Sequence, residues 1–210
     1  GDNGTSIGAC YLSTKDVIPD LKSIRLDNYY SGSRFSNEEI EVILHDNNVK
    51  FLKPENLEIY VAKKISQQKI IAWFQGGAEF GPRALGNRSI LTAPFPKEMK
   101  DIINSRVKFR ESFRPFAPAI LSEYANTYFD IKQSSPHMLI AVNTRSEKIS
   151  EIPAVVHVDT SARVQTVSKD NNPRFRKLLE CSYEETNCPV ILNTSSVSYT
   201  HLTLPTILLV

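Results

Sequence analysis

The residues best suited to chemistry in this chain are the arginines of residues 79–118, which stand among Gly, Pro and aromatic residues and not along a polar helix face. Turn-forming pairs such as Gly81-Pro82 fix the backbone where the charges sit. An arginine presents a planar, two-pronged donor that matches a phosphate or a carboxylate. We therefore expect residues 79–89 and 108–118 to form the wall of an anion-binding pocket. Charge alone leaves a solvated basic surface as an alternative.

A second candidate group is His157, Asp159 and Arg163. Two residues that lie two positions apart on a strand point to the same side, and Arg163 follows the intervening turn. His157 and Asp159 could orient a ligand while Arg163 binds a phosphate or carboxyl group. The alternative is that His157 faces the core and Arg163 pairs with Asp159.

A third candidate group is Asn193-Thr194-Ser195, which follows a predicted buried strand. The end of such a strand is a favoured place for ligand contact in an α/β sheet. These three residue types also favour a helix N-cap, and taken alone they favour the cap.

The motifs that the sequence lacks limit the chemistry further. It contains no Walker loop, no Gly-x-Gly-x-x-Gly and no Ser-His-Asp spacing that could support a nucleophile. The arginines and one lysine, together with Asn, Ser and Thr, suit electrostatic stabilisation of phosphoryl or acyl-phosphate chemistry.

Composition excludes several classes of protein. The 210 residues carry a net charge of only +2, which argues against binding a long nucleic acid by charge alone. The three cysteines are an odd number and lack metal-ligand spacing, so neither a disulfide framework nor a zinc site is indicated. We find no signal peptide and no apolar run that could span a bilayer, and the cytoplasm is the expected compartment.

Helices and strands that interleave along the chain predict an α/β or α+β fold. The pattern from Ser36 to Glu39 is a capping box and predicts a helix with Ile40, Ile43 and Leu44 on its apolar face. Further helices are predicted over residues 54–68, 96–107 and 173–186, and strands over residues 69–74, 138–142, 154–158, 162–167 and 188–192. The helix over residues 96–107 separates Arg83 from Lys108, but a compact chain folds back, so that both can face one cavity.

Four stretches in this order resemble the C-terminal half of the O-carbamoyltransferases, the family that includes nodulation protein U and the cephalosporin and aminoglycoside carbamoyltransferases. They are residues 79–94, 107–118, 152–167 and 189–195. The resemblance implies a YrdC-like twisted mixed sheet with flanking helices, preceded by the end of an actin/hexokinase-like domain.

The resemblance also implies a reaction. Members of this family form carbamoyl-adenylate from carbamoyl phosphate and ATP, which enters with Mg²⁺. They then pass the carbamoyl group to a hydroxyl of a sugar, antibiotic or similar acceptor in the preceding domain, which holds an iron-type metal. Small anions are thus the expected ligands, and neither a membrane nor a nucleic acid is an expected partner.

Site residues are carried over from the resemblance by position. The predicted catalytic residues are Lys108, Arg114 and Arg163. The predicted substrate- or nucleotide-binding residues are Arg83, Asn87, Arg88, Ser89, His157, Asn193 and Thr194. Asp2 resembles the last metal ligand of the preceding domain.

Three segments are predicted. Residues 1–30 are expected to be the end of the acceptor domain with a linker, and residues 31–195 to be the YrdC-like domain. Residues 196–210 depart from the family pattern and resemble foreign or frame-shifted sequence. We therefore expect the chain to be the C-terminal part of a longer protein and to be incomplete or inactive alone.

Two other functions remain open from the sequence. One is the related threonylcarbamoyl-adenylate synthase chemistry of tRNA modification, which shares the fold. The other is a non-catalytic module that binds an anion or RNA through the same basic pocket.

Overall fold

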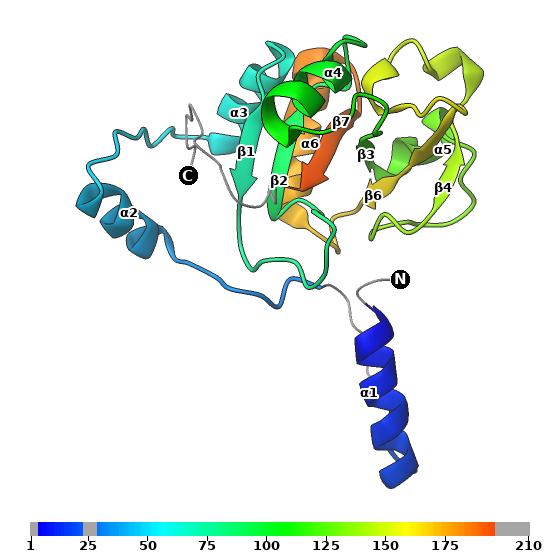
Figure 1. Ribbon diagram of the computed structural model, residues 1–210. Coiled ribbons are helices and arrows are strands. Elements are labelled where there is room, and N and C mark those ends of the chain that lie inside the picture. The colour runs from blue at the N-terminus through cyan, green and yellow to red at the C-terminus, as the bar shows by residue number, and fades with distance from the viewer. Residues whose placement is uncertain (1–3, 23–28, 196–210) are drawn as a thin grey trace.

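The computed structural model describes residues 4–22 and 29–195, and its centre is a five-stranded sheet with the order β1-β2-β7-β3-β6 (Figure 1). Strands β3 and β6 pair in parallel, and the other neighbouring strands of this sheet pair antiparallel. A mixed sheet flanked by helices confirms the predicted fold class, in its α+β form. The strands are β1 (Ile71–Phe74), β2 (Arg88–Thr92), β7 (Val190–Ser195), β3 (Ala117–Leu121) and β6 (Gln165–Val167).

The central strand β7 divides the core between the two faces of the sheet. Ile191 packs in one cluster with residues of α3 (Leu57–Ser66) and α6 (Pro173–Thr186). Its neighbours Val190 and Leu192 pack in a second cluster with residues of α4 (Met99–Ile103). Because successive side chains of a strand point to opposite faces, a run that is apolar throughout is buried on both sides.

A smaller antiparallel sheet supports one of the candidate residues. Its strands are β4 (Ala141–Asn143) and β5 (Ser161–Arg163), and the short helix α5 (Ala125–Tyr128) precedes them in the chain. One buried residue, Val164, separates the end of β5 from the start of β6. This connection fixes Arg163 beside the first residue of β6, at an edge of the main sheet.

Two sequence-predicted helices are confirmed in detail. The capping box at Ser36 is present, since Ser36 Oγ accepts from Glu39 N at 3.1 Å and Glu39 Oε2 accepts from Ser36 N at 2.7 Å. Helix α6 begins at Pro173 and ends at Thr186, as predicted, with Asn172 as its N-cap.

Three local predictions are wrong. Residues 154–158 do not form a strand, because Pro153 begins a 3₁₀ turn (Pro153–Val155). The helix over residues 96–107 is α-helical only from Met99 to Ile103 and continues as a π-helical turn (Asn104–Lys108). Residues 193–195 are not a helix cap but the end of β7, paired with β2 and β3.

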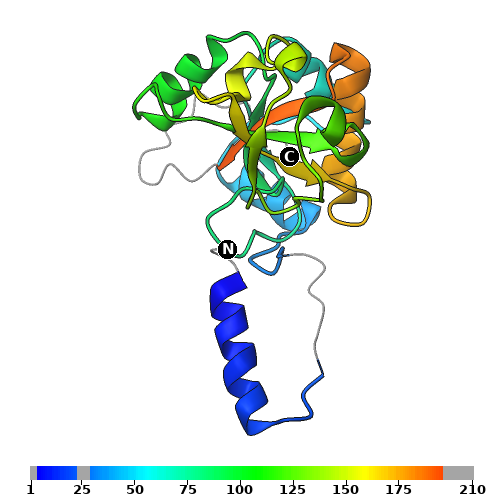
Figure 2. The same ribbon diagram turned by 90° about the vertical axis from the view of Figure 1, so that its right-hand side faces the viewer.

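Helix α1 (Gly4–Val17) stands apart from the sheet in both views (Figures 1 and 2), and α2 (Asn37–Asp46) lies to one side of it in Figure 1. No residue of α1 is buried, and the predicted apolar face of α2 buries Leu44 but leaves Ile43 50% exposed. Amphipathic spacing therefore predicted the α2 helix correctly but not its burial. Among the described residues, no helix has the length and apolar character needed to cross a membrane.

We predict that Gly86→Ala destabilises the fold by more than about 2 kcal/mol, because Gly86 has a φ of +104° and an added Cβ would clash with the ring of Phe175. Phe175 belongs to α6 and its side chain is fully buried in the core, so its ring cannot move away easily. Chemical denaturation measures the change. The matched control is Gly8→Ala in α1, where nothing lies within 4 Å of the new Cβ. An equal loss in both variants would contradict this account.

Candidate functional site: an arginine-lined cavity at one end of the sheet

Loops that are distant in sequence meet at one end of the main sheet. There the last residue of β7, Ser195, pairs with Ser89 near the start of β2, and Asn193 pairs with Ala117 at the start of β3. Gln165, the first residue of β6, pairs with Ala119. The loop that precedes β2, the loop that precedes β3 and the end of β5 are therefore brought together.

A cavity of about 100 Å³ lies at this end. Three segments each contribute one arginine to its lining: Arg83 from the loop before β2, Arg110 from the loop before β3, and Arg163 from β5. The lining residues are Pro82, Arg83, Ala84, Arg110, Pro115, Phe116, Ala117, Met138, Arg163, Asn193, Thr194 and Ser195. The arrangement suits a small anion with several oxygens.

Lys108 adjoins the cavity through Ser195. Its Nζ donates to the Ser195 carbonyl at 2.6 Å and to Ser195 Oγ at 3.3 Å. Burial lowers the pKa of Lys108 to about 8, and the nearby Arg110 lowers it as well. A fourth cation, whose charge is sensitive to pH, thus lies beside the three arginines.

The loop that carries Arg83 is held by a carboxylate. Glu79 Oε1 accepts from three backbone N–H groups, those of Leu85 at 2.7 Å, Asn87 at 2.9 Å and Arg88 at 3.2 Å. One acidic side chain therefore closes the turn over residues 79–88. The Glu79 carboxylate binds backbone donors of its own loop, so Arg83 reaches the cavity from a fixed backbone.

The carbonyl groups of the same loop are bound from the sheet. Asn193 Nδ2 donates to the Ala84 carbonyl at 3.1 Å, and Gln165 Nε2 donates to the Leu85 carbonyl at 2.9 Å. Tyr30 adds a bond from its hydroxyl to the Leu85 carbonyl at 3.2 Å. These contacts fix the two residues that follow Arg83.

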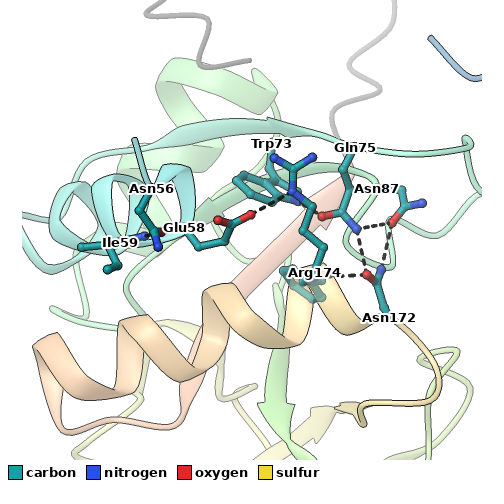
Figure 3. Close-up of polar contacts among 9 residues, drawn as sticks. Asn56, Glu58, Ile59, Trp73, Gln75, Asn87, Asn172 and Arg174 are labelled. Atoms are coloured by element: carbon teal, nitrogen blue, oxygen red, sulfur yellow. Dashed lines mark hydrogen bonds and ion pairs between the residues drawn. The ribbon is translucent and has the colours of Figure 1, made fainter. Parts of the chain in front are cut away.

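Asn87 belongs to a network of buried amides (Figure 3). Gln75 Nε2 donates to Asn87 Oδ1 at 3.0 Å and to Asn172 Oδ1 at 2.7 Å, and Asn172 Nδ2 donates to Asn87 Oδ1 at 2.8 Å. Asn172 is also the N-cap of α6, so the network joins the loop to that helix.

Arg88 and Ser89 serve the loop in the same way. Arg88 donates to four backbone carbonyls, those of Ser33, Gln75, Gly76 and Asn87, and its guanidinium lies 3.5 Å from the centre of the Phe74 ring. Ser89 Oγ accepts from Gly86 N at 3.1 Å. The cavity-lining residues include none of Asn87, Arg88 and Ser89, whose predicted substrate-binding role stays a prediction.

The loop before β3 places Arg110, which was not among the predicted site residues, against the cavity. Arg114 is not among the lining residues, and its predicted catalytic role stays a prediction. Phe109 has a φ of 47°, and this left-handed residue ends the π-helical turn and reverses the chain. Arg110 Nε then donates to Asn104 Oδ1 at 2.7 Å. Arg114 pairs instead with Glu111 at 2.8 Å and its side chain is 52% exposed. The spacing of apolar residues in the helix does not predict this chain reversal. The only sequence signal for Arg110 is its position two residues after Lys108.

His157 lies in a turn and not on a strand, so the geometry predicted for it with Asp159 is wrong. Both residues instead contact Ser161 Oγ, His157 through Nδ1 at 3.1 Å and Asp159 through Oδ1 at 2.7 Å. Burial lowers the pKa of His157, while Asp159 opposes the shift. His157 lines a separate, open hollow with Phe113, beyond Pro115. Its ligand role stays a prediction.

Asp2, the predicted metal ligand, lies outside the described residues. Within residues 4–22 and 29–195, no group of three or more His, Cys, Asp or Glu is placed to hold a metal ion. The fold and the cavity thus define a class of protein: an α+β domain with an arginine-lined cavity at one end of a mixed sheet.

Comparison with known proteins identifies the family. The family model described as the carbamoyltransferase C-terminus matches residues 62–200. The chain therefore belongs to the carbamoyltransferase C-terminal family.

Several curated proteins are similar to this chain over almost its whole length. Nodulation protein NolO of Bradyrhizobium diazoefficiens is 37% identical, over 92% of this chain and 36% of its own length. Nodulation protein U of Rhizobium fredii is 34% identical, over 93% of this chain and 32% of its own length. An uncharacterised protein of Synechocystis is 39% identical, over 93% of this chain and 36% of its own length. The chain spans about a third of the length of these curated relatives.

We predict that Glu79→Ala loosens the cavity wall. Each buried backbone donor left without its acceptor costs about 1–3 kcal/mol, so the variant should unfold at lower denaturant concentration and bind sulfate more weakly. Asp20→Ala is the control, because Asp20 is an exposed carboxylate outside this loop. Normal sulfate affinity in folded Glu79→Ala would show that the carboxylate does not position Arg83.

The lowered pKa of Lys108 predicts that anion binding depends on pH. Its pKa of about 8 means that the ammonium loses its proton as the pH rises from about 7 to about 9, so sulfate affinity should fall over that range. Sulfate keeps its own charge there. In Lys108→Arg the charge persists and the profile should be flat.

Stability should move in the opposite direction. Because the pKa of Lys108 is lower in the folded chain than the ordinary 10.5, the unfolded chain binds more protons between about pH 8 and pH 10.5. The contribution of Lys108 to the free energy of unfolding should therefore rise with pH in this window.

For sulfate binding, an affinity that falls equally steeply with pH in the unsubstituted chain and in Lys108→Arg would contradict the assignment to Lys108.

Proposed function

We propose that this chain is the adenylate-forming part of an ATP-dependent carbamoyltransferase. It would form carbamoyl-adenylate from carbamoyl phosphate and ATP, for transfer to a hydroxyl of a sugar, antibiotic or similar small acceptor. One observation carries the proposal: Arg83, Arg110 and Arg163 converge on one cavity, with Lys108 beside it. Membership of the carbamoyltransferase family supports the choice of the carbamoyl group.

The electrostatics of the cavity support this reaction. Bringing two anionic reactants together requires fixed cations that offset their repulsion, and cations already held in place do so without reorganising. Arg110 is held in this way by Asn104, and the backbone that follows Arg83 is held by Glu79 and Asn193. The loops that carry the arginines are therefore held in place by contacts within the protein itself.

The size of the cavity bears on what it encloses. At about 100 Å³ it is smaller than the roughly 300–1,000 Å³ of a typical ligand pocket. It has room for a phosphate-sized group and its carbamoyl substituent, and the nucleoside must lie outside it. Arg163 and Arg83 then serve as phosphate ligands in the proposed complex.

The proposed chemistry balances with ATP and water as co-reactants. Water attacks the phosphorus of carbamoyl phosphate, the bond from phosphorus to the carbamoyl oxygen breaks, and carbamate and inorganic phosphate result. A carbamate oxygen then bonds to the α-phosphorus of ATP, and pyrophosphate leaves. Finally the acceptor hydroxyl attacks the carbamoyl carbon, loses its proton, and releases AMP. We propose that Lys108 and the arginines stabilise the charge that develops in the phosphoryl-transfer steps.

The acceptor site and the iron-type metal are proposed to belong to a preceding domain, with Asp2 as its last ligand in this chain. Mg²⁺ is proposed to enter with ATP. No step assigned above to the described residues uses a metal ligand of this chain.

The test is carbamoyl-phosphate-dependent exchange of labelled pyrophosphate into ATP. We expect the chain, or the chain joined to its natural flanking sequence, to show this exchange. Arg163→Ala and Lys108→Ala should each reduce the rate by about 10²–10³-fold, because each removes one donor that stabilises transition-state charge. Arg106→Ala is the matched control, since Arg106 is an exposed arginine on the same turn as Lys108.

Other outcomes assign other functions. Exchange that requires bicarbonate and threonine would assign the threonylcarbamoyl-adenylate reaction. Absence of exchange in a folded protein with its natural flanks, together with RNA binding that weakens steeply with salt, would assign a binding module and overturn the proposal.

A further inference from the structure

The segment over residues 29–34 lies beside the loop that joins β1 and β2 (Figure 1). Three backbone hydrogen bonds connect them: Gly32 N donates to the Ala78 carbonyl at 2.9 Å, Ala78 N to the Ser33 carbonyl at 3.0 Å, and Phe80 N to the Tyr29 carbonyl at 2.6 Å. The 29–34 segment is therefore bound to the part of the loop that precedes Arg83.

Tyr30 connects the same segment to the part of the loop that follows Arg83. Its hydroxyl donates to the Leu85 carbonyl at 3.2 Å and accepts from Asn172 Nδ2 at 3.1 Å. Burial raises the pKa of Tyr30 to about 12, so the hydroxyl keeps its proton and remains a donor at neutral pH. The Tyr30 ring packs against Leu85 and Met138, and Met138 lines the cavity.

The 29–34 segment also holds the carboxylate that closes the loop. Glu79 stands between Ala78 and Phe80, and the backbone groups of both neighbours bond to the segment. The Glu79 carboxylate in turn accepts from Leu85 N, while Tyr30 binds the Leu85 carbonyl. The segment thus fixes both the backbone of Glu79 and one of the residues that its carboxylate binds.

These contacts lie on both sides of Arg83, so they limit where its side chain can reach. We propose that the 29–34 segment positions Arg83 in the anion site, with Tyr30 as a positioning residue. The inference rests on the proposed function, since it takes Arg83 as a ligand of the anion. It adds a role in the site for a segment that stands at the predicted boundary between a linker and the YrdC-like domain.

Gly32→Ala tests the segment without changing a residue that lines the cavity. An added Cβ would lie 2.8 Å from Ala78 Cβ and 2.9 Å from the Ala78 carbonyl oxygen, so the segment must shift away from the loop. We expect the dissociation constant for sulfate, measured by calorimetry on the full chain, to rise about 5- to 20-fold. Gly4→Ala is the matched control and should keep its affinity, because nothing lies within 4 Å of the new Cβ there.

Double variants distinguish the positioning of Arg83 from a general loss of stability. Once Arg83→Gln has removed the side chain that the segment positions, Gly32→Ala should change the sulfate affinity by less than about twofold. Combined with Arg110→Gln, which removes an arginine of a different loop, Gly32→Ala should keep its full effect. Circular dichroism establishes that each variant is folded before affinities are compared.

Tyr30→Phe removes only the hydroxyl and keeps the ring. Sulfate binding should weaken by about 2- to 5-fold, because one hydrogen bond to the loop is lost while Leu85 keeps the bond from Gln165 Nε2 at 2.9 Å. Tyr11→Phe in α1, a helix without buried residues, should leave the affinity unchanged.

The outcomes separate the inference from the function on which it rests. Unchanged sulfate affinity in folded Gly32→Ala and folded Tyr30→Phe would overturn the inference while the anion site stands. An effect of Gly32→Ala that is as large with Arg83→Gln as without it would overturn it too. If the unsubstituted chain binds neither sulfate nor phosphate, the anion site is absent, and the proposed function and the inference both fail. Should Gly32→Ala not fold, Tyr30→Phe decides, alone and combined with Arg83→Gln.

Discussion

The bonds between the Glu79 carboxylate and three backbone N–H groups are the constraint on which the rest of the site depends. A loop with Gly81 and Gly86 at positive φ has much conformational freedom to lose on folding. One carboxylate that accepts three bonds fixes its turn, and the close approach of Gly86 to Phe175 fixes its depth against α6. Arg83 therefore reaches the cavity from a backbone that is part of the core.

The arginines near the cavity differ in what they contact. Arg88 donates to carbonyls of its own and neighbouring loops, and so acts as a structural ligand of the backbone. Arg110 is held by Asn104 and stacks 4.7 Å from the centre of the Phe116 ring, which leaves part of its fork at the cavity wall. Two arginines of similar sequence setting thus have different roles, because only the tertiary contacts distinguish them.

Much of the fold could be predicted from the sequence, since α6, the cap of α2 and the strands β1 and β7 follow from local patterns. The convergence of residues 79–89 and 108–118 on one cavity was also predicted from turn chemistry and arginine content. The position of Arg110 against the cavity could not be predicted, because it depends on a π-helical turn and a left-handed Phe109. The contacts of Asn87 and Arg88 could not be predicted from spacing either, because their partners include Asn172, 85 positions from Asn87, and Ser33, 55 positions from Arg88.

Several positive charges lie close together at this end of the sheet, and their mutual repulsion adds to the effect of burial on two pKa values. Burial lowers the pKa of both Lys108 and Arg110, and each shift is increased by a neighbouring arginine. An anion bound at the proposed site would offset that repulsion and favour the charged form of Lys108, so that binding and protonation would be linked.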